Sequence, residues 1–428
     1  MTSNKKGLLA LSPLIVFIAI YMSASIAAGD FYKMPISVAF MISSIYAVCL
    51  SARGKGLKNS INSFSRGASA SNIMLMLWIF ILAGAFANAA RTIGSVDATV
   101  NLMLSILPEN MVLPGLFLAT CFISLSIGTS VGTIVALVPI AAGLATSTGT
   151  NMALMTAVVV GGAFFGDNLS FISDTTIAAT SSQGCSMKDK FRVNFFITLP
   201  AAIAVLVVYT FMGMDLNPTT STHGVDMIKV IPYLAVLATA IAGMNVMAVL
   251  TAGIVLTGII GIASGNISIL EWFHAMGDGL MGMGELIIVT MLAGGMFETV
   301  KERGGIDYII EKISSHIHGK RGAEAVTGML VAAIDVCTAN NTVAIISVGG
   351  IARRISETFD IDRRKTASLL DTCSCCMQGI IPYGAQMLMA SGLTKLNPVD
   401  IIPYLYYPFA LAVCVAVAIV FRLPRRYS

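Results

Sequence analysis

The residues best suited to chemistry are a group of oxygen-bearing side chains set within an apolar segment. The segment from Gly161 to Thr180 is apolar toward both ends, and its centre carries Asp167, Asn168, Ser170, Ser173, Asp174, Thr175 and Thr176. Carboxylate and hydroxyl oxygens are the ligands that a small, hard cation prefers. Carboxylates embedded in a membrane are costly, and by default they mark the path of an ion or a proton. We therefore expect this set to bind an ion or substrate, with Asp167, Ser173 and Asp174 as Na⁺ ligands.

Gly166 directly precedes this polar run, which predicts that a helix opens at this point. An opened helix frees backbone carbonyls, and these can join the side-chain oxygens around a cation. The alternative is a polar loop outside the membrane, which the apolar residues close on both sides disfavour. We predict a broken helix over residues 150–180.

A second polar run extends from Leu370 to Gln386, with helix-breaking residues at Gly379, Pro382 and Gly384. We interpret Asp371 as the parallel of Asp167, and we expect Gln378 and Tyr383 to contact the ion or substrate. The alternative is a structural kink surrounded by packed polar residues. The sequence therefore predicts a second broken helix over residues 365–394.

Two further apolar stretches, 112–146 and 322–352, are too long for one membrane crossing and have polar centres. Their central small polar residues are Thr129, Ser130 and Thr133 in the first, and Thr338, Asn340, Asn341 and Thr342 in the second. We interpret both stretches as re-entrant hairpins, whose half-helix N-termini would point toward an anionic group. Alternatively these side chains bond back to the backbone of a tight turn, and both interpretations can hold together.

The elements that must position these residues are written twice along the chain. The run from Leu82 to Asp97 is echoed by the run from Leu292 to Asp307, with Leu, Ala, Gly, a basic residue, Gly and Asp recurring in order. Duplicated halves in an apolar chain are typical of secondary transporters, whose substrate sites lie between the repeats. We predict a first repeat over residues 1–213 and a second over residues 228–428.

The composition excludes an ordinary soluble protein. Hydrophobic residues make up 56% of the 428 residues and charged residues only 11%, against about 25% charged in a soluble domain. We therefore predict an all-α polytopic membrane protein. Its ten expected spans are 8–28, 34–51, 71–91, 150–180, 192–213, 228–244, 245–264, 284–301, 365–394 and 400–421.

The basic residues predict the orientation. With both termini in the cytoplasm, only Lys33, Arg91, Lys229 and Lys395 of the 26 basic residues lie outside, as the positive-inside rule requires. Lys190 and Lys365 are among those placed in the cytoplasm. Each half then has five crossings and one hairpin, so the second half is inverted relative to the first. The amphipathic stretches 95–107 and 306–316 are expected at the interface, in a cell inner membrane.

A few titratable residues remain outside these motifs. Asp335 either caps a hairpin helix or joins the site, and Glu298 is expected to form an interfacial ion pair with nearby basic residues. All four histidines fall in loops or interfacial helices: His223, His274, His316 and His318. We therefore expect carboxylates to bind any transported proton. Cys373, Cys375 and Cys376 lack a nearby histidine or second cysteine pair and are interpreted as packing residues.

At these motifs the chain resembles the NhaC-type Na⁺/H⁺ antiporter family of the ion transporter superfamily. The run from Gly166 to Thr176 is similar to the family signature Gly-Asp-x-x-Ser-Pro-x-Ser-Asp-Thr-Thr. It departs from that pattern at Asn168, where lysine is usual, and at Phe171, where proline is usual. The resemblance implies an elevator-like carrier, in which the hairpins and broken helices form a transport domain and the remaining helices a scaffold.

The leading hypothesis is a cation-coupled secondary active transporter, most simply a Na⁺/H⁺ antiporter in which Asp167 and Asp174 bind Na⁺ or protons competitively. The runner-up is a Na⁺- or H⁺-coupled transporter or exchanger of an amino acid or small organic acid. An enzyme is not expected, because an intramembrane aspartyl protease would need a glycine at Phe164. We expect no cofactor apart from Na⁺, no nucleic-acid partner, a lipid bilayer environment and a homodimer formed by apolar scaffold helices such as 245–264.

Overall fold

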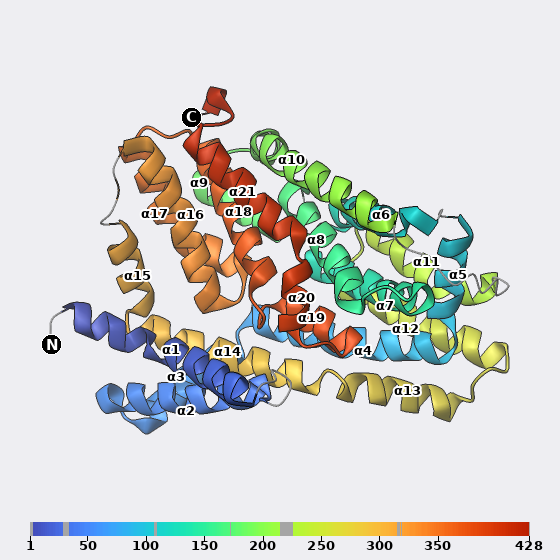
Figure 1. Cartoon of the computed structure of the whole chain (residues 1–428). Helices are drawn as coiled ribbons and strands as arrows, with labels where there is room; N and C mark the ends of the chain where they lie inside the picture. The colour runs from blue at the N-terminus through green and yellow to red at the C-terminus, as the bar shows by residue number, and fades with distance from the viewer. Residues whose placement is uncertain are drawn as a thin grey trace.

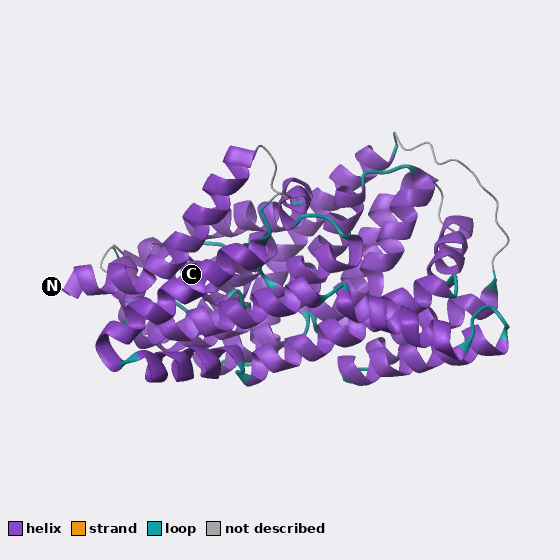
Figure 2. Ribbon diagram, turned by 90° about the horizontal axis from the view of Figure 1, so that it is seen from below, coloured by secondary structure: helices purple, strands orange, loops and turns teal. Residues whose placement is uncertain are grey.

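The computed structural model describes residues 3–28, 34–106, 109–171, 173–214, 226–314, 317 and 319–427. Within these ranges every regular element is a helix, and the loops are short connections (Figure 2). Lys33, His223, His316 and His318 lie outside the described residues. The all-helical fold agrees with the predicted class.

The helices of the second half follow those of the first in the same order. The first half contains α1 (Ser3–Ala28), α2 (Ile36–Lys55), α3 (Leu57–Ala68), α4 (Ser71–Thr92), α5 (Ser95–Ile106), α6 (Val112–Ile127), α7 (Ser130–Thr148), α8 (Met152–Leu169), α9 (Asp174–Gln183) and α10 (Met187–Gly213). The second half contains α11 (Met227–Ile241), α12 (Val246–Ala263), α13 (Ile269–Met281), α14 (Gly284–Glu302), α15 (Gly305–Ser314), α16 (Gly319–Thr338), α17 (Asn341–Thr358), α18 (Arg363–Ile380), α19 (Ala385–Thr394), α20 (Pro398–Ile401) and α21 (Tyr406–Val420). Each long helix, short helix and helix pair of the first half thus has a counterpart in the second.

Apolar helices long enough to cross a membrane are numerous, as expected of a polytopic membrane protein. Eight such helices or continuous helix pairs occur among the described residues, or nine if α20 and α21, bent by 55° at their junction, count together. The correspondence with the ten predicted spans is not one to one. α18 and α19 carry many polar residues and fall below the required hydropathy, whereas α7, predicted as one arm of a hairpin, is long and apolar enough to qualify.

Two helices, α3 and α13, lie between predicted spans, in the stretches 52–70 and 265–283. α13 begins with a capping box, in which the Ser268 hydroxyl accepts the Glu271 N–H and the Glu271 carboxylate accepts the Ser268 N–H. Such reciprocal bonds satisfy backbone donors at a helix start and stabilise it. The predicted span 284–301 coincides with α14, and α13 precedes it as an additional helix that ends at Met281.

α3 and α13 form the two crossings that hold the base of the molecule together. α3 packs against α14 and α13 packs against α4. At each crossing two glycines meet: a Cβ atom at Gly67 would overlap the Gly294 carbonyl, and a Cβ atom at Gly279 would overlap the Gly84 carbonyl. Small residues allow helix backbones in a membrane to approach this closely.

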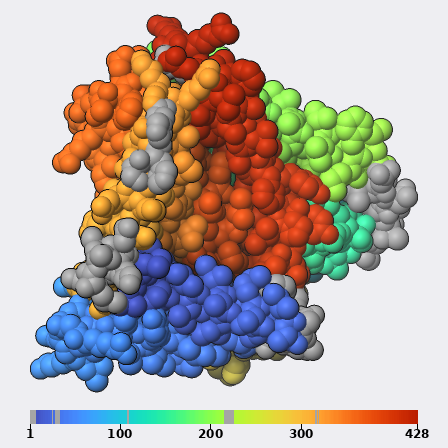
Figure 3. Space-filling view, turned by 60° about the vertical axis from the view of Figure 1, so that its left-hand side comes forward, coloured from blue at the N-terminus to red at the C-terminus, as the bar shows by residue number. Residues whose placement is uncertain are grey.

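These helices make a base layer, and the hairpins and broken helices lie on it. In Figure 1, α1 to α4, α13 and α14 run along the lower side, with α16 to α21 and α6 to α10 above them. Figure 3 shows the same layering, with the N-terminal helices in blue beneath the orange and red helices of the second half. We call the lower group, together with α5, α11 and α12, the scaffold helices.

Above the scaffold, each stretch predicted as a hairpin is a helix pair joined by a sharp turn. α6 and α7 pack against α8, and α16 and α17 pack against α18. The turns contain one residue in the left-handed region, Gly128 with φ 73° in the first and Ala339 with φ 50° in the second. We call these turns the first tip and the second tip.

Candidate functional site

Asp167 lies at the contact between the first broken helix and the first tip. Its side chain is only 4% exposed and accepts a hydrogen bond of 2.9 Å from the Ser130 N–H, at the start of α7. The neighbouring Gly166 lets α8 approach α6 closely, because a Cβ atom there would overlap Ser124. The carboxylate therefore sits at a helix N-terminus, where backbone N–H groups favour negative charge.

A chain of side-chain amides continues from the first tip to the second. Gln386 of α19 donates to the Ser130 hydroxyl at 3.0 Å, and Gln378 of α18 donates to the Gln386 carbonyl oxygen at 2.8 Å. Gln378 also donates to the backbone carbonyl of Ala339 at 3.1 Å. Both tips and both broken helices thus meet around one hydrogen-bonded path that begins at Asp167.

The helix breaks three residues later than Gly166, between Leu169 and Asp174, and its exposed backbone is satisfied by side chains. Ser173 caps α9, accepting from the Thr176 N–H at 3.2 Å and donating to the Asp167 carbonyl at 2.9 Å. The Thr176 hydroxyl donates to the Ser170 carbonyl at 2.9 Å. Broken backbone at membrane depth is tolerated when protein groups take up its polar atoms in this way.

A buried ion pair lies directly behind the break. Lys190 of α10 forms a 2.7 Å ion pair with Asp371 of α18, and their side chains are 1% and 0% exposed. Asn194 donates to the same Asp371 oxygen at 2.7 Å. Lys190 and Asn194 also both donate to the Asn168 carbonyl, at 2.8 and 2.7 Å. Lys190 is therefore a buried, ion-paired residue, not the solvated cytoplasmic flank that the charge pattern predicted.

Lys190 and Asn194 are the site residues that the sequence analysis missed. They are four residues apart on α10, so they share one face of the helix, and this spacing was the signal available in the sequence. Lys365, also expected in the cytoplasm, is likewise buried and donates to the Leu423 carbonyl.

The structure also corrects the pairing of the two acidic residues. Asp167 stands two residues before the end of α8, and Gln378 stands two residues before the end of α18. Gln378 is therefore the counterpart of Asp167. Asp371 lies two turns earlier in α18, where it faces α10 instead of a tip.

Asp174 is placed apart from Asp167, at the first position of α9. Its side chain is exposed and lines a groove of about 520 Å³ between α9 and α17. Thr342 and Ile346 of α17 form the opposite wall. The three predicted Na⁺ ligands therefore divide into a buried carboxylate, a helix cap at Ser173 and a carboxylate in an open groove.

Most of the remaining predicted site residues make local contacts. Thr133 donates to the Thr129 carbonyl at 2.9 Å, and the Asn340 and Asn341 side chains accept from Val343 and Thr342 N–H groups at 3.0 Å. The Tyr383 hydroxyl donates to the Val336 carbonyl at 2.7 Å, and its ring contacts Phe17 and Phe40 of the scaffold. The Thr175 hydroxyl is within 3.4 Å of the Asp167 carbonyl.

Several buried oxygen atoms around the break have no hydrogen-bond partner among the described residues. They are Asn168 Oδ1, Asn194 Oδ1, Asp371 Oδ1 and Gln378 Oε1. Buried acceptors left without a donor are unusual and call for a ligand, an ion or a water. This region therefore combines a buried carboxylate with spare oxygen atoms, the donor set that suits a monovalent cation.

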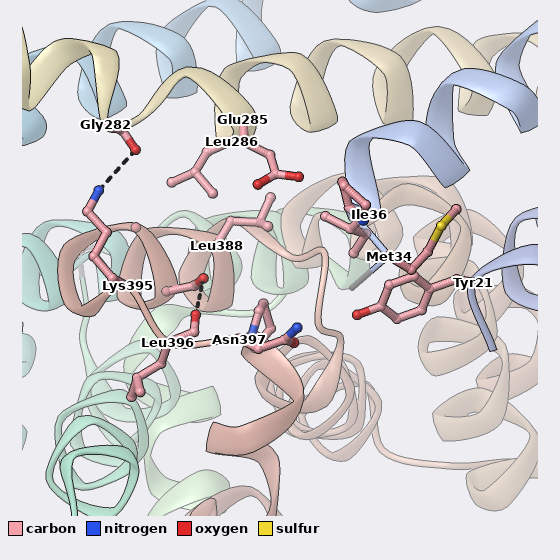
Figure 4. A pocket seen from close by; sticks show the side chains of 14 residues that line it. Tyr21, Met34, Ile36, Gly282, Glu285, Leu286, Leu388, Lys395, Leu396 and Asn397 are labelled. Carbon is pink, nitrogen blue, oxygen red and sulfur yellow. Dashed lines mark hydrogen bonds between the residues drawn. The ribbon is translucent and has the colours of Figure 1, made fainter. Parts of the chain in front are cut away.

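A second pocket of about 230 Å³ lies between the scaffold and α19, and none of the predicted site residues lines it. Figure 4 shows Tyr21, Glu285, Lys395 and Asn397 around it, with the Lys395 ammonium donating to the Gly282 carbonyl at 3.2 Å. It brings together the connections α1–α2, α13–α14 and α19–α20. All three were predicted on the outer face of the membrane.

Comparison with known proteins supplies the family. The sequence model of the Na⁺/H⁺ antiporter family matches residues 6–214 and 217–423. The Na⁺/H⁺ antiporter NhaC of Bacillus subtilis (strain 168) is 24% identical over 82% of this chain and 83% of its own length. The malate-2H⁺/Na⁺-lactate antiporter of the same strain is 20% identical over 95% and 93%.

Among solved structures, the YdaH transporter of Alcanivorax borkumensis aligns with a TM-score of 0.46 and 12% identity, covering 91% of this chain and 99% of its own. The family model extends over almost the whole sequence and confirms the family predicted from the polar motif. The chain therefore belongs to the Na⁺/H⁺ antiporter family and is a multi-pass membrane antiporter rather than an enzyme.

Proposed function

We propose that Na⁺ and H⁺ exchange by competing for Asp167. The observation that carries the proposal is the position of this carboxylate, buried against the first tip and hydrogen-bonded to its backbone N–H. A carboxylate that holds either a proton or a Na⁺ ion, but not both, couples the two fluxes without ATP. Each ligand then shifts the same equilibrium between the two access states.

The donor set proposed for Na⁺ is narrower than the sequence suggested. Asp167 supplies the charge at the first tip, whereas the Asn168 amide faces Tyr407 of α21. Ser173 positions the break as the cap of α9, so its effect on Na⁺ is indirect. Asp174 is assigned to the groove, where its exposed carboxylate raises the local cation concentration.

An asymmetry in packing supports alternating access. α7 packs against α5 and α11, and α19 packs against α4 and α14. Among the described helices, their counterparts α17 and α9 have no comparable packing against the scaffold. Exchanging these two arrangements would close the groove at Asp174 and open the opposite face, which is the motion of an elevator-like carrier.

The proposed orientation places the groove on the cytoplasmic face and the pocket of Figure 4 on the outer face. In a variant lacking the native cysteines, a cysteine at Ser181 should react with a membrane-impermeant thiol reagent only from the cytoplasmic side. A cysteine at Lys395 should react only from outside. Labelling from the opposite sides would reverse the proposed orientation. The homodimer formed through α12 stays a prediction.

The exchange itself is tested in proteoliposomes containing a pH-sensitive dye. Adding Na⁺ to the wild type should produce a proton flux, and Asp167→Asn should abolish it. Loss of a charged ligand costs about 1.5–3 kcal/mol, or about a 10- to 150-fold weaker Na⁺ affinity. Asp174→Asn is the matched control and should raise the half-saturating Na⁺ concentration mainly at low ionic strength. Full activity in Asp167→Asn would overturn the assignment.

A second candidate is exchange of a small organic acid or amino acid. It is favoured by the name of the malate-2H⁺/Na⁺-lactate antiporter and by the groove of about 520 Å³, because small-molecule sites occupy about 300–1,000 Å³. This candidate predicts no Na⁺-driven proton flux in liposomes until the solute is added. A flux with salt alone would exclude an obligatory solute.

A further inference from the structure

Asp335 is a buried carboxylate that the proposed ion site does not use. It lies three residues before the end of α16, and its side chain is 0% exposed. Neither carboxylate oxygen has a hydrogen-bond partner among the described residues. Its backbone carbonyl accepts hydrogen bonds from the Ala339 N–H at 2.8 Å and from the Thr338 hydroxyl at 3.4 Å. Asp335 therefore does not cap a hairpin helix, because a capping carboxylate would accept backbone N–H groups.

The first half shows what a side chain at this place does. Ser124 stands three residues before the end of α6, so it is the counterpart of Asp335. Its hydroxyl donates to the Ala163 carbonyl of α8 at 2.7 Å and ties the first hairpin to its broken helix. The counterpart of Ala163 is Ser374, which stands six residues before the end of α18. An ionised carboxylate accepts hydrogen bonds only, whereas a protonated one can donate as Ser124 does.

Among the described residues, no cationic side chain pairs with Asp335. α16 packs against α14, α15, α17, α18 and α21. Cations on the packed helices have other partners: Lys301 pairs with Glu298, Arg353 and Arg363 pair with Glu357, and Lys365 donates to the Leu423 carbonyl. Lys190, the buried cation of α10, is already paired with Asp371. Burying an unpaired charge is among the costliest arrangements in a protein.

A small cavity lies beside the second tip. Its volume of about 20 Å³ is enough for one water molecule, and Thr338, Asn340 and Tyr383 line it together with Thr290 of α14. The Thr290 hydroxyl is buried and has no partner among the described residues. A water held there would stand between the tip and the scaffold, next to the turn that follows Asp335.

From this geometry we infer that Asp335 is a second proton-binding site, separate from Asp167 and carried by the second hairpin. In the state described here the carboxyl group is protonated and donates to a carbonyl of α18, in the manner of Ser124. When the second tip leaves the scaffold, the carboxyl O–H bond breaks, the proton passes to water, and the carboxylate becomes solvated. The inference rests on the proposed exchange, to which it adds one proton per cycle.

The protonation state can be read without any transport. Infrared spectra of the full chain in lipid nanodiscs at neutral pH should contain a protonated-carboxyl C=O band that Asp335→Asn removes. The band should persist in Asp360→Asn, a control that alters an exposed carboxylate paired with Lys320. A spectrum unchanged by Asp335→Asn would overturn the inference. Asp335→Ser, which copies the first half and keeps a donor, serves if the asparagine variant does not fold.

The added proton changes the H⁺:Na⁺ ratio of exchange. This ratio is obtained by imposing a fixed Na⁺ gradient and finding the pH gradient at which the net Na⁺ flux is zero. Asp335→Ser should still exchange, with the H⁺:Na⁺ ratio lower by one than in the wild type. An unchanged ratio would overturn the transport role of Asp335. If the wild type shows no Na⁺-dependent flux, the proposed exchange fails, while the infrared result still decides whether Asp335 holds a proton.

Discussion

The two halves of the chain share a framework, but they carry different charges: Asp167 and Lys190 belong to the first half and Asp371 to the second. Asp167 in α8 corresponds to Gln378 in α18. Lys190 and Asn194, the fourth and eighth residues of α10, correspond to Ile401 and Leu405. The duplicated geometry brings two tips and two broken helices together. Polar residues that occur in only one half then determine which half binds the ion.

Asp371 links the two halves across this difference. It belongs to the second half, yet its partners Lys190 and Asn194 belong to the first. The carbonyl freed by the break, that of Asn168, receives hydrogen bonds from the same two side chains. Lys190 thus supplies, from α10, a positive charge beside the position where the family pattern has lysine and this chain has Asn168.

Breaking the Lys190–Asp371 pair should have the largest effect on stability. Lys190→Met leaves Asp371 as an unpaired buried charge, which costs about 3–5 kcal/mol. Asp371→Leu should cost a similar amount for the same reason. The double variant should recover much of the loss, because buried pairs are often replaceable by apolar residues. The check is a double-mutant cycle on thermal unfolding in detergent, and additive losses would contradict the pairing.

The glycine crossings test the part of the framework that the halves share. Gly279→Ala should destabilise the protein by about 1–3 kcal/mol, as overpacking typically does, because its Cβ would overlap the Gly84 carbonyl. Gly67→Ala should do the same against the Gly294 carbonyl. Similar losses of unfolding free energy at both positions would support two equivalent crossings. A loss at only one position would show that the two crossings contribute unequally to the stability of the scaffold.

Gly277→Ala is the matched control on the same helix as Gly279. A Cβ at Gly277 meets nothing within 4 Å, and alanine is favoured over glycine in a helix interior by up to about 1 kcal/mol. The control should therefore be neutral or slightly stabilising in the same unfolding assay. A loss equal to that of Gly279→Ala would contradict the explanation from close approach, because a Cβ atom at Gly277 meets no neighbour.

The sequence predicted the framework better than the site. Helix pairs at the hairpins and breaks near Ser170 and Pro382 follow from apolar length and from local glycine, proline and polar residues. The position of Lys190 could not be predicted in this way, because a lysine near the start of an apolar helix resembles an ordinary cytoplasmic flank. Only its contact with Asp371, 181 positions away in the sequence, makes it part of the core.

The different locations of the Asp167 and Asp174 carboxylates could not be predicted from the sequence either. Their spacing within one motif suggested a single ligand set, yet the break between α8 and α9 turns one carboxylate inward and leaves the other in the groove. The counterpart of Asp167 was misassigned for a related reason. An acidic residue was matched to an acidic residue, whereas helix ends pair Asp167 with Gln378.

The smallest expected effect concerns the amide path that joins the two tips. Gln386→Ala removes hydrogen bonds to the Ser130 hydroxyl and from Gln378, each worth about 0.5–1.5 kcal/mol. Gln183→Ala removes a comparable buried bond, from Gln183 to the Gly349 carbonyl, away from both tips. Both variants should lose similar stability, but only Gln386→Ala should weaken Na⁺ binding, because the tip that contacts Asp167 then loses its link to the second half. Equal Na⁺ affinities in the two variants would mean that the first half binds the ion without help from the second.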